Sequence, residues 1–129
     1  MLSEVPKVRQ DTGEPFRRWF TDEYFDLIVW YEPSGAFFGF QLCYSRLNRE
    51  RALTWIRGRG YTHKRVSYME GPTTVGGSPL LIPDGVFEYR TVADRFREEA
   101  KRLEPELVQF VLEKLLRYPE KNETKGVRQ

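Results

Sequence analysis

Cysteine and histidine are nearly absent from this sequence of 129 residues, which contains one of each. Cys43 has no second cysteine with which to form an intramolecular disulfide. A Cys/His zinc site needs more ligands than Cys43 and His63 can supply together. We therefore predict a chain without a structural metal ion and without a cofactor.

Long apolar runs and a strong net charge are also missing. No stretch approaches the roughly 20 apolar residues of a transmembrane helix. The first seven residues, Met1 to Lys7, lack the basic segment and apolar stretch of a secretory signal. The formal net charge of +2 is too small for strong global attraction to nucleic acid or to an anionic membrane. These absences predict a cytoplasmic protein without a membrane partner, whose electrostatic interactions are local.

The composition that remains is typical of one globular domain. Hydrophobic residues make up 40% of the chain, aromatic residues 15% and charged residues 31%, and no repeat or linker divides the sequence. Only the two ends are polar with few apolar residues. We expect a flexible N-terminal segment over residues 1–14, a single α+β domain over residues 15–118 and a disordered charged tail over residues 119–129.

The first half of the domain has the pattern of an antiparallel sheet, because aromatic and β-branched residues cluster in short runs between turn residues. The clearest turn is Glu32-Pro33-Ser34-Gly35, in which proline fixes φ and glycine permits a positive φ. Residues 70–79 predict a mobile loop, and residues 80–87 a small hairpin or a covering strand. We predict an N-terminal meander of four to five strands, over residues 16–20, 24–31, 36–44, 52–57 and 61–68.

Two helices are predicted to follow the strands. In the first, Thr91 is expected to cap the N-terminus, and apolar residues recur every three or four positions at Ala93, Phe96, Ala100 and Leu103. Pro105 suits the first turn of the second helix, whose wider apolar stripe consists of Leu107, Val108, Val111, Leu112, Leu115 and Leu116. Strands followed by helices favour an α+β fold with both helices packed on one face of the sheet.

The strand over residues 24–31 has more apolar residues than a half-covered sheet requires. Side chains alternate across a sheet, so a face without helices should be polar. Here both alternating sets are largely apolar, and the second set includes Tyr24, Ile28 and Trp30. An exposed aromatic patch of this kind marks a contact with a protein or a ligand. The alternative is that a loop or the N-terminal segment covers it.

Local positive charge is the second functional feature. Between Arg46 and Arg65 there are seven basic residues and one acidic residue, a formal charge of +6. Aromatic rings between arginines suit single-stranded nucleic acid, whose bases stack on them. The alternative is a solvated turn neutralised by helix acids. The residues predicted to bind a partner are Trp55, Arg57, Arg59, Tyr61, His63, Lys64, Arg65, Trp30 and Tyr24.

These features predict a non-catalytic binding or regulatory module for an acidic partner, either a protein or single-stranded nucleic acid. One alternative is a homodimer formed through the same patch. Another is a small enzyme with a site at Cys43 and His63, since a nucleophilic cysteine needs a neighbouring base. The spacing does not favour that enzyme. A lone cysteine between Leu42 and Tyr44 is typical of a core position, and His63 is expected to be a surface residue of a strand.

Overall fold

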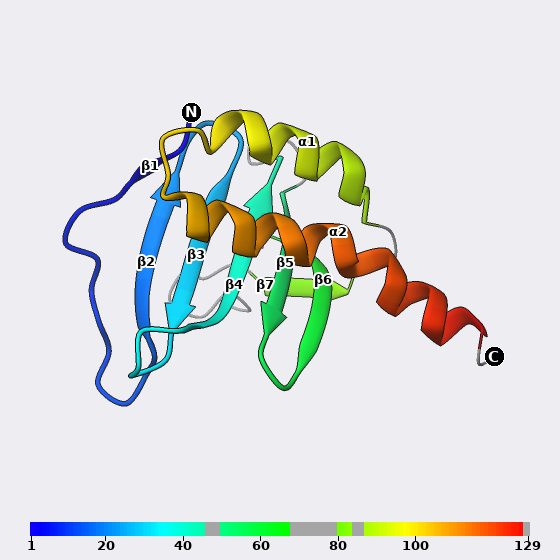
Figure 1. Cartoon of the computed structure of the whole chain (residues 1–129), viewed down its shortest axis with the longest axis horizontal. Coiled ribbons are helices and arrows are strands. Elements are labelled where there is room, and N and C mark those ends of the chain that lie inside the picture. The colour runs from blue at the N-terminus through cyan, green and yellow to red at the C-terminus, as the bar shows by residue number, and fades with distance from the viewer. Residues whose placement is uncertain (46–49, 68–79, 84–86, 128–129) are drawn as a thin grey trace. The chain divides into compact units, whose positions relative to one another are not determined.

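The α+β fold predicted from the sequence is confirmed by a computed structural model of the chain (Figure 1). The structure describes residues 1–45, 50–67, 80–83 and 87–127. The predicted mobile loop over residues 70–79 lies outside these ranges. The chain forms two compact units: Glu4–Phe87 contains most of the sheet, and Glu88–Gln129 contains the two helices together with Met1–Ser3.

The sheet is a meander in which each strand pairs with the next along the chain. It has six strands of four residues or more instead of the four to five predicted, and a two-residue strand, β1 (Ser3–Glu4), precedes them. The additional strand is β7, which extends the sheet by pairing antiparallel with β6. The six strands are β2 (Phe16–Thr21), β3 (Asp26–Tyr31), β4 (Phe37–Tyr44), β5 (Arg51–Ile56), β6 (Gly60–Ser67) and β7 (Leu80–Pro83).

Strand β3 begins two residues later than the sequence predicts, at Asp26 rather than Tyr24. The reason is the carboxylate of Asp22, whose Oδ1 accepts hydrogen bonds from the backbone N–H groups of Tyr24 at 2.8 Å and Phe25 at 2.7 Å. An aspartate that bonds backbone groups two and three residues ahead stabilises a turn in place of a strand. The turn between β2 and β3 is therefore longer than predicted.

The two faces of the sheet differ in burial. On one, which we call the buried face, the central side chains are at most 1% exposed, and they are Phe20, Leu27, Val29, Phe40, Leu42 and Leu53. The other, which we call the open face, carries the alternate side chains of the same strands. Trp19 is 37% exposed there, and Ile28, Trp30, Gln41, Thr54 and Ile56 are half-buried.

Gly39 shows why one position of the open face lacks a side chain. A Cβ atom at Gly39 would lie 2.5 Å from the carbonyl oxygen of Trp55 and 2.8 Å from Cδ1 of Ile56. The space is therefore already occupied by the neighbouring strand and by the side chain of Ile56. In the register of the sheet, Gly39 pairs with Trp30 on one side and with Ile56 on the other. Ile56 thus extends the apolar surface next to Trp30.

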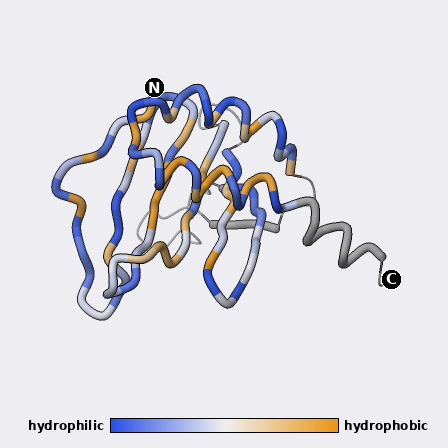
Figure 2. The backbone as a smooth tube through the Cα atoms, viewed as in Figure 1, coloured by the Kyte–Doolittle hydropathy of each residue, from blue (hydrophilic) through white to orange (hydrophobic). Residues whose placement is uncertain are grey.

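The helices have the predicted order and apolar stripes. Helix α1 (Tyr89–Glu99) buries Val92, Ala93 and Phe96, and helix α2 (Pro105–Val127) buries Leu107, Val111 and Leu115. The prediction for Thr91 is wrong, because α1 begins two residues earlier, at Tyr89, and has no side-chain cap. Hydrophobic and hydrophilic residues alternate along the described part of α2 (Figure 2).

Some structural predictions remain untested. Helix α2 continues to Val127, beyond the boundary predicted at residue 118. The domain boundaries, the flexible N-terminal segment, the disordered tail and the packing of the helices on the sheet all stay predictions. Among the described residues, no helix combines the length and the apolar character needed to cross a membrane.

Candidate functional site

The residues predicted to bind a partner are divided among several parts of the Glu4–Phe87 unit. Trp55 and Tyr61 are direct cross-strand partners, and their side chains share the face of Phe40. Trp30 and Lys64 belong to the open face. Arg57 and Arg59 lie in the β5–β6 turn, and Arg65 is exposed near the end of β6. Tyr24 lies in the β2–β3 turn, where its hydroxyl accepts a hydrogen bond from Ser45.

His63 is a buried residue, and its prediction as a surface strand residue is wrong. Its side chain is on the buried face, opposite Leu53. The Nε2 atom is 2.5 Å from the hydroxyl of Tyr44, and the two rings are nearly parallel, with an angle of 8° between them. Phe87 contacts both rings. Strand alternation explains this placement. His63 is two residues from Tyr61 and so lies on the same face, whereas the side chains of Thr62 and Lys64 point to the open face.

Cys43 and His63 cannot form a catalytic pair within this sheet. The cross-strand register joins Cys43 to Ala52 and Ala52 to Lys64, whereas it joins Leu42 to Leu53 and Leu53 to His63. Neighbouring positions on a strand point to opposite faces, so the thiol and the imidazole lie on opposite sides of the sheet. Cys43 is also buried. In the described residues, no cluster of His, Cys, Asp and Glu could hold a metal ion.

The two arginines of the β5–β6 turn have different environments. Arg57 donates a hydrogen bond to the carbonyl of Phe37 at 2.8 Å and lies 3.4 Å from a carboxylate oxygen of Glu32. Its side chain therefore joins this turn to the neighbouring β3–β4 turn. Arg59 is exposed, and neither it nor Lys64 pairs with a carboxylate in the part of the chain that the structure describes. Arg59 is thus the turn arginine best suited to bind an external anion.

On the open face, Trp30 and Ile28 of the predicted aromatic patch form a block with Arg17 and Trp19, which were not predicted from the sequence as site residues. Arg17 pairs across the strands with Trp30, and Trp19 pairs with Ile28. Directly opposite side chains in an antiparallel pair are about 5 Å apart at Cβ. The guanidinium of Arg17 therefore lies beside the indole of Trp30, and the side chain of Ile28 lies beside the indole of Trp19. The indole N–H of Trp19 donates a hydrogen bond to Asp26, which fixes the orientation of that ring.

The block continues toward the β5–β6 turn. The row that begins with Arg17 and Trp30 passes through Gly39 and Ile56 to Gly60. The row ends at Gly60, just after the exposed turn residue Arg59, and Lys64 of β6 lies on the same side of the sheet as the two indoles. The alternation of Arg17 and Trp19 could have placed both on one face, but only the register between β2 and β3 shows that Trp30 shares that face.

Comparisons of the chain with protein-family models, curated proteins and solved structures found no match.

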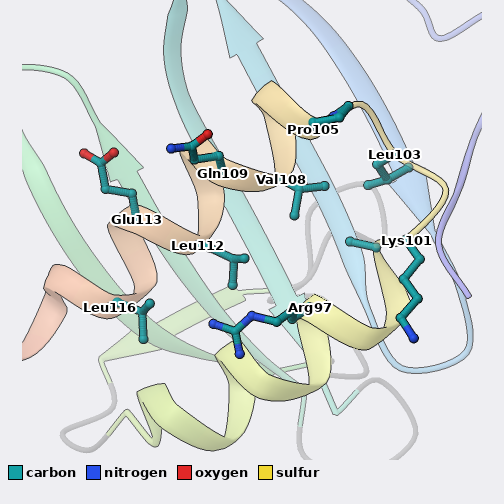
Figure 3. Close-up of a pocket in the computed structure, with 10 residues that line it drawn as sticks. Arg97, Lys101, Leu103, Pro105, Val108, Gln109, Leu112, Glu113 and Leu116 are labelled. Carbon is teal, nitrogen blue, oxygen red and sulfur yellow. The ribbon is translucent and has the colours of Figure 1, made fainter.

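The helical unit has a second candidate surface, a groove of about 540 Å³ between α1 and α2 (Figure 3). Leu112 and Val108 of α2 point into this groove, and Leu116, at its end, is 44% exposed. The α1 side carries Arg97 and, just beyond the end of the helix, Lys101, which form ion pairs with Asp94 and Glu98 of α1. The predicted wide stripe of α2 therefore divides into a buried row and a row that lines the groove.

Proposed function

We propose that this protein is a non-catalytic binding module that holds single-stranded nucleic acid on the open face of its sheet. The observation that carries the proposal is the open face itself, where Trp30 and Ile56 lie in one row with Arg17 at its end and Lys64 lies on the same face, next to the turn that carries exposed Arg59. Bases stack on exposed or half-exposed rings whatever their sequence, and cations beside the rings neutralise phosphates. An acidic protein segment would satisfy the cations but would make little use of two flat indole surfaces.

The experiment is a fluorescence-anisotropy titration of labelled single-stranded DNA and RNA. We expect binding that weakens with salt, with a logarithmic slope of about −0.7 for each phosphate contacted. Trp30→Ala should weaken binding by about 1 to 3 kcal/mol, the usual contribution of one stacked base. The charge reversal of Arg59 and Lys64 to glutamate should both weaken binding and make the salt dependence shallower.

The matched control reverses the same number of charges on the helical unit. Arg90→Glu with Arg102→Glu gives the same net charge as the double reversal on the sheet, and both residues are exposed. This control should lose much less affinity, because its charges are not on the proposed surface. Equal losses in the two double variants would reduce the effect to net charge and overturn the proposal. Binding of polyglutamate with no binding of oligonucleotide would instead assign the surface to an acidic protein.

A homodimer is the second candidate, and the groove of the helical unit favours it. Arg97 and Glu113 line the groove from its α1 and α2 sides. We propose that two copies pack groove to groove about a two-fold axis parallel to the groove, so that Glu113 of one copy approaches Arg97 of the other. The ion pairs that these two residues make within their own helices are solvent-exposed and therefore weak enough to exchange. Exposed Leu116 would be covered in the same contact.

Sedimentation velocity tests this second candidate. We expect Arg97→Glu alone and Glu113→Arg alone to dissociate the dimer, and the combination of both changes to restore it, because the charges then complement each other in reversed order. A wild-type chain that is monomeric at high concentration would exclude the homodimer. It would leave the nucleic-acid proposal unaffected, since that surface belongs to the sheet.

A further inference from the structure

A pocket of about 270 Å³ opens beside the block of tryptophans, between the N-terminal segment and strands β2 and β3. Its volume lies just below the range of about 300 to 1,000 Å³ that is usual for drug-sized ligands. It therefore suits a molecule of one or two rings. Its lining consists of Val5, Pro6, Lys7, Val8, Arg9, Arg17, Trp19 and Ile28.

Hydrogen bonds hold the two sides of this pocket together. The backbone N–H of Val5 donates to the carbonyl of Trp19 at 2.8 Å. Farther along, the side-chain amide of Gln10 accepts from the backbone N–H of Arg17 at 3.0 Å and donates to its carbonyl at 2.8 Å. The Nε of Arg17 also donates to the carbonyl of Arg9 at 2.9 Å. Both ends of the segment are thus joined to β2, so the pocket exists before any ligand arrives.

The charge around this pocket is positive. Three cationic residues, Lys7, Arg9 and Arg17, line it. Two carboxylates lie nearby: that of Asp11, 3.1 Å from Arg9 and 3.7 Å from Arg17, and that of Asp26, which accepts the hydrogen bond of the Trp19 indole. The side chain of Arg9 is 86% exposed, so its pair with Asp11 is weak and can yield to a ligand. Three cations against two carboxylates leave a net positive charge that attracts an anion.

Lys7 is also held in a backbone conformation that lysine rarely adopts. Its φ is +55°, in the left-handed region that costs most residues about 1 to 2 kcal/mol. Such conformations cluster at ligand sites, where the surrounding structure maintains them. At this position the turn bends the segment around the pocket and makes Lys7 part of its lining. The strain and the charge therefore occur at the same residue.

We infer that this pocket binds a small planar aromatic anion, with its ring against Trp19 and the apolar side chains of the segment and its phosphate or carboxylate at Lys7 and Arg9. This site shares Arg17, Trp19 and Ile28 with the open face, but its proposed anion contacts, Lys7 and Arg9, belong to the N-terminal segment and not to the surface proposed for a strand. The shared chemistry of its ligands is one aromatic group joined to one anion. A free nucleotide and an aromatic carboxylic acid both have it.

Calorimetric titrations with two matched pairs of probes test the inference. Adenosine 5′-monophosphate should bind and adenosine should bind at least about tenfold more weakly, if a charge-assisted contact of about 1.5 to 3 kcal/mol is lost. Phenylacetate and phenylacetamide form the second pair. The stronger of the two anions identifies phosphate or carboxylate as the preferred group. Failure of both anions to bind at millimolar concentration would overturn the inference.

Variants of the segment locate the site. Lys7→Asn removes the charge but keeps a residue that tolerates the left-handed conformation, and it should weaken binding of the preferred anion about tenfold. Arg102→Ala, on the helical unit, should change nothing. In NMR spectra, the indole N–H signal that disappears in Trp19→Phe should shift on addition of the ligand. Binding that neither moves this signal nor responds to Lys7→Asn would place the ligand elsewhere and reject the site.

The same preparations separate this inference from the proposed function. If Lys7→Asn loses the small anion but keeps its affinity for the oligonucleotide, the two sites are independent. If the oligonucleotide does not bind to the wild-type chain at all while the small anion does, the proposed function fails and the pocket remains. If the oligonucleotide binds and neither anion does, the pocket is rejected and the strand surface remains.

Discussion

The two faces of the sheet are made by the same strands, yet they are suited to different tasks. On the buried face, Phe40 and Leu42 are completely covered, and the polar His63 is paired with Tyr44. On the open face, Trp19 and Trp30 keep part of their rings exposed, with Arg17 beside them. Aromatic content alone therefore does not indicate function. A ring becomes a candidate contact only where the folded sheet leaves it partly uncovered.

The largest expected effect is a loss of stability on the buried face. Phe40→Ala should lower the free energy of unfolding by about 3 to 5 kcal/mol, because it removes a fully buried ring and leaves a cavity. Urea denaturation measures this loss. Trp30→Ala is the matched change on the open face and should cost less stability, since Trp30 is only half-buried. If the tryptophan change costs as much, the distinction between the faces breaks down.

Gly39 tests whether the open face has a fixed packing of its own. Gly39→Ala should lower the unfolding free energy by about 1 to 3 kcal/mol, the usual cost of overpacking, because the added Cβ meets a backbone oxygen that cannot move alone. Thr54→Ala, a half-buried position on the same face, serves as the control and should cost less. A neutral Gly39→Ala would mean that β4 and β5 separate easily beneath the proposed binding surface.

A smaller effect is expected from the polar pair on the buried face. Tyr44→Phe removes the hydroxyl that lies 2.5 Å from Nε2 of His63. The free energy of unfolding should fall by about 1 to 3 kcal/mol if the imidazole loses this hydrogen bond. We expect a value near the lower end of this range, because His63 makes further contacts. Oligonucleotide affinity should not change. A fall in affinity with unchanged stability would make the Tyr44–His63 pair functional and weaken the contrast between the faces.

Much of the fold could be predicted from the sequence, because strand parity and helix periodicity are local. The alternating residues Phe25, Leu27 and Val29 are buried in the structure, as are Ala93, Phe96 and Ala100 of the predicted helical stripe. The start of β3 could not be predicted in this way, since it depends on the side chain of Asp22 competing for backbone N–H groups. β7 was ambiguous because a short apolar run does not show which strand it will join.

Less of the candidate site could be predicted, because a site depends on register. A charge count from Arg46 to Arg65 assumes that residues close in sequence share one surface. In strand β6, however, the side chains of Lys64 and Arg65 point to opposite faces of the sheet. Arg57 and Arg59 look equivalent in the sequence, yet Arg57 is bonded to the β3–β4 turn. The contribution of Arg17 and Trp19 was missed, because they lie far from Trp55 in the sequence and share a face with Trp30 through pairing alone.

The smallest expected change in stability occurs at Lys7, where stability and binding should move in opposite directions. Lys7→Gly relieves the left-handed strain but adds flexibility to the unfolded chain, so the gain in unfolding free energy should be at most about 1 kcal/mol. The same change removes an ammonium group from the pocket and should weaken binding of the small anion about tenfold. Thermal denaturation and calorimetry on one sample measure both quantities. A variant that is less stable and binds equally well would show that the conformation of Lys7 serves the fold of the N-terminal segment and not a ligand.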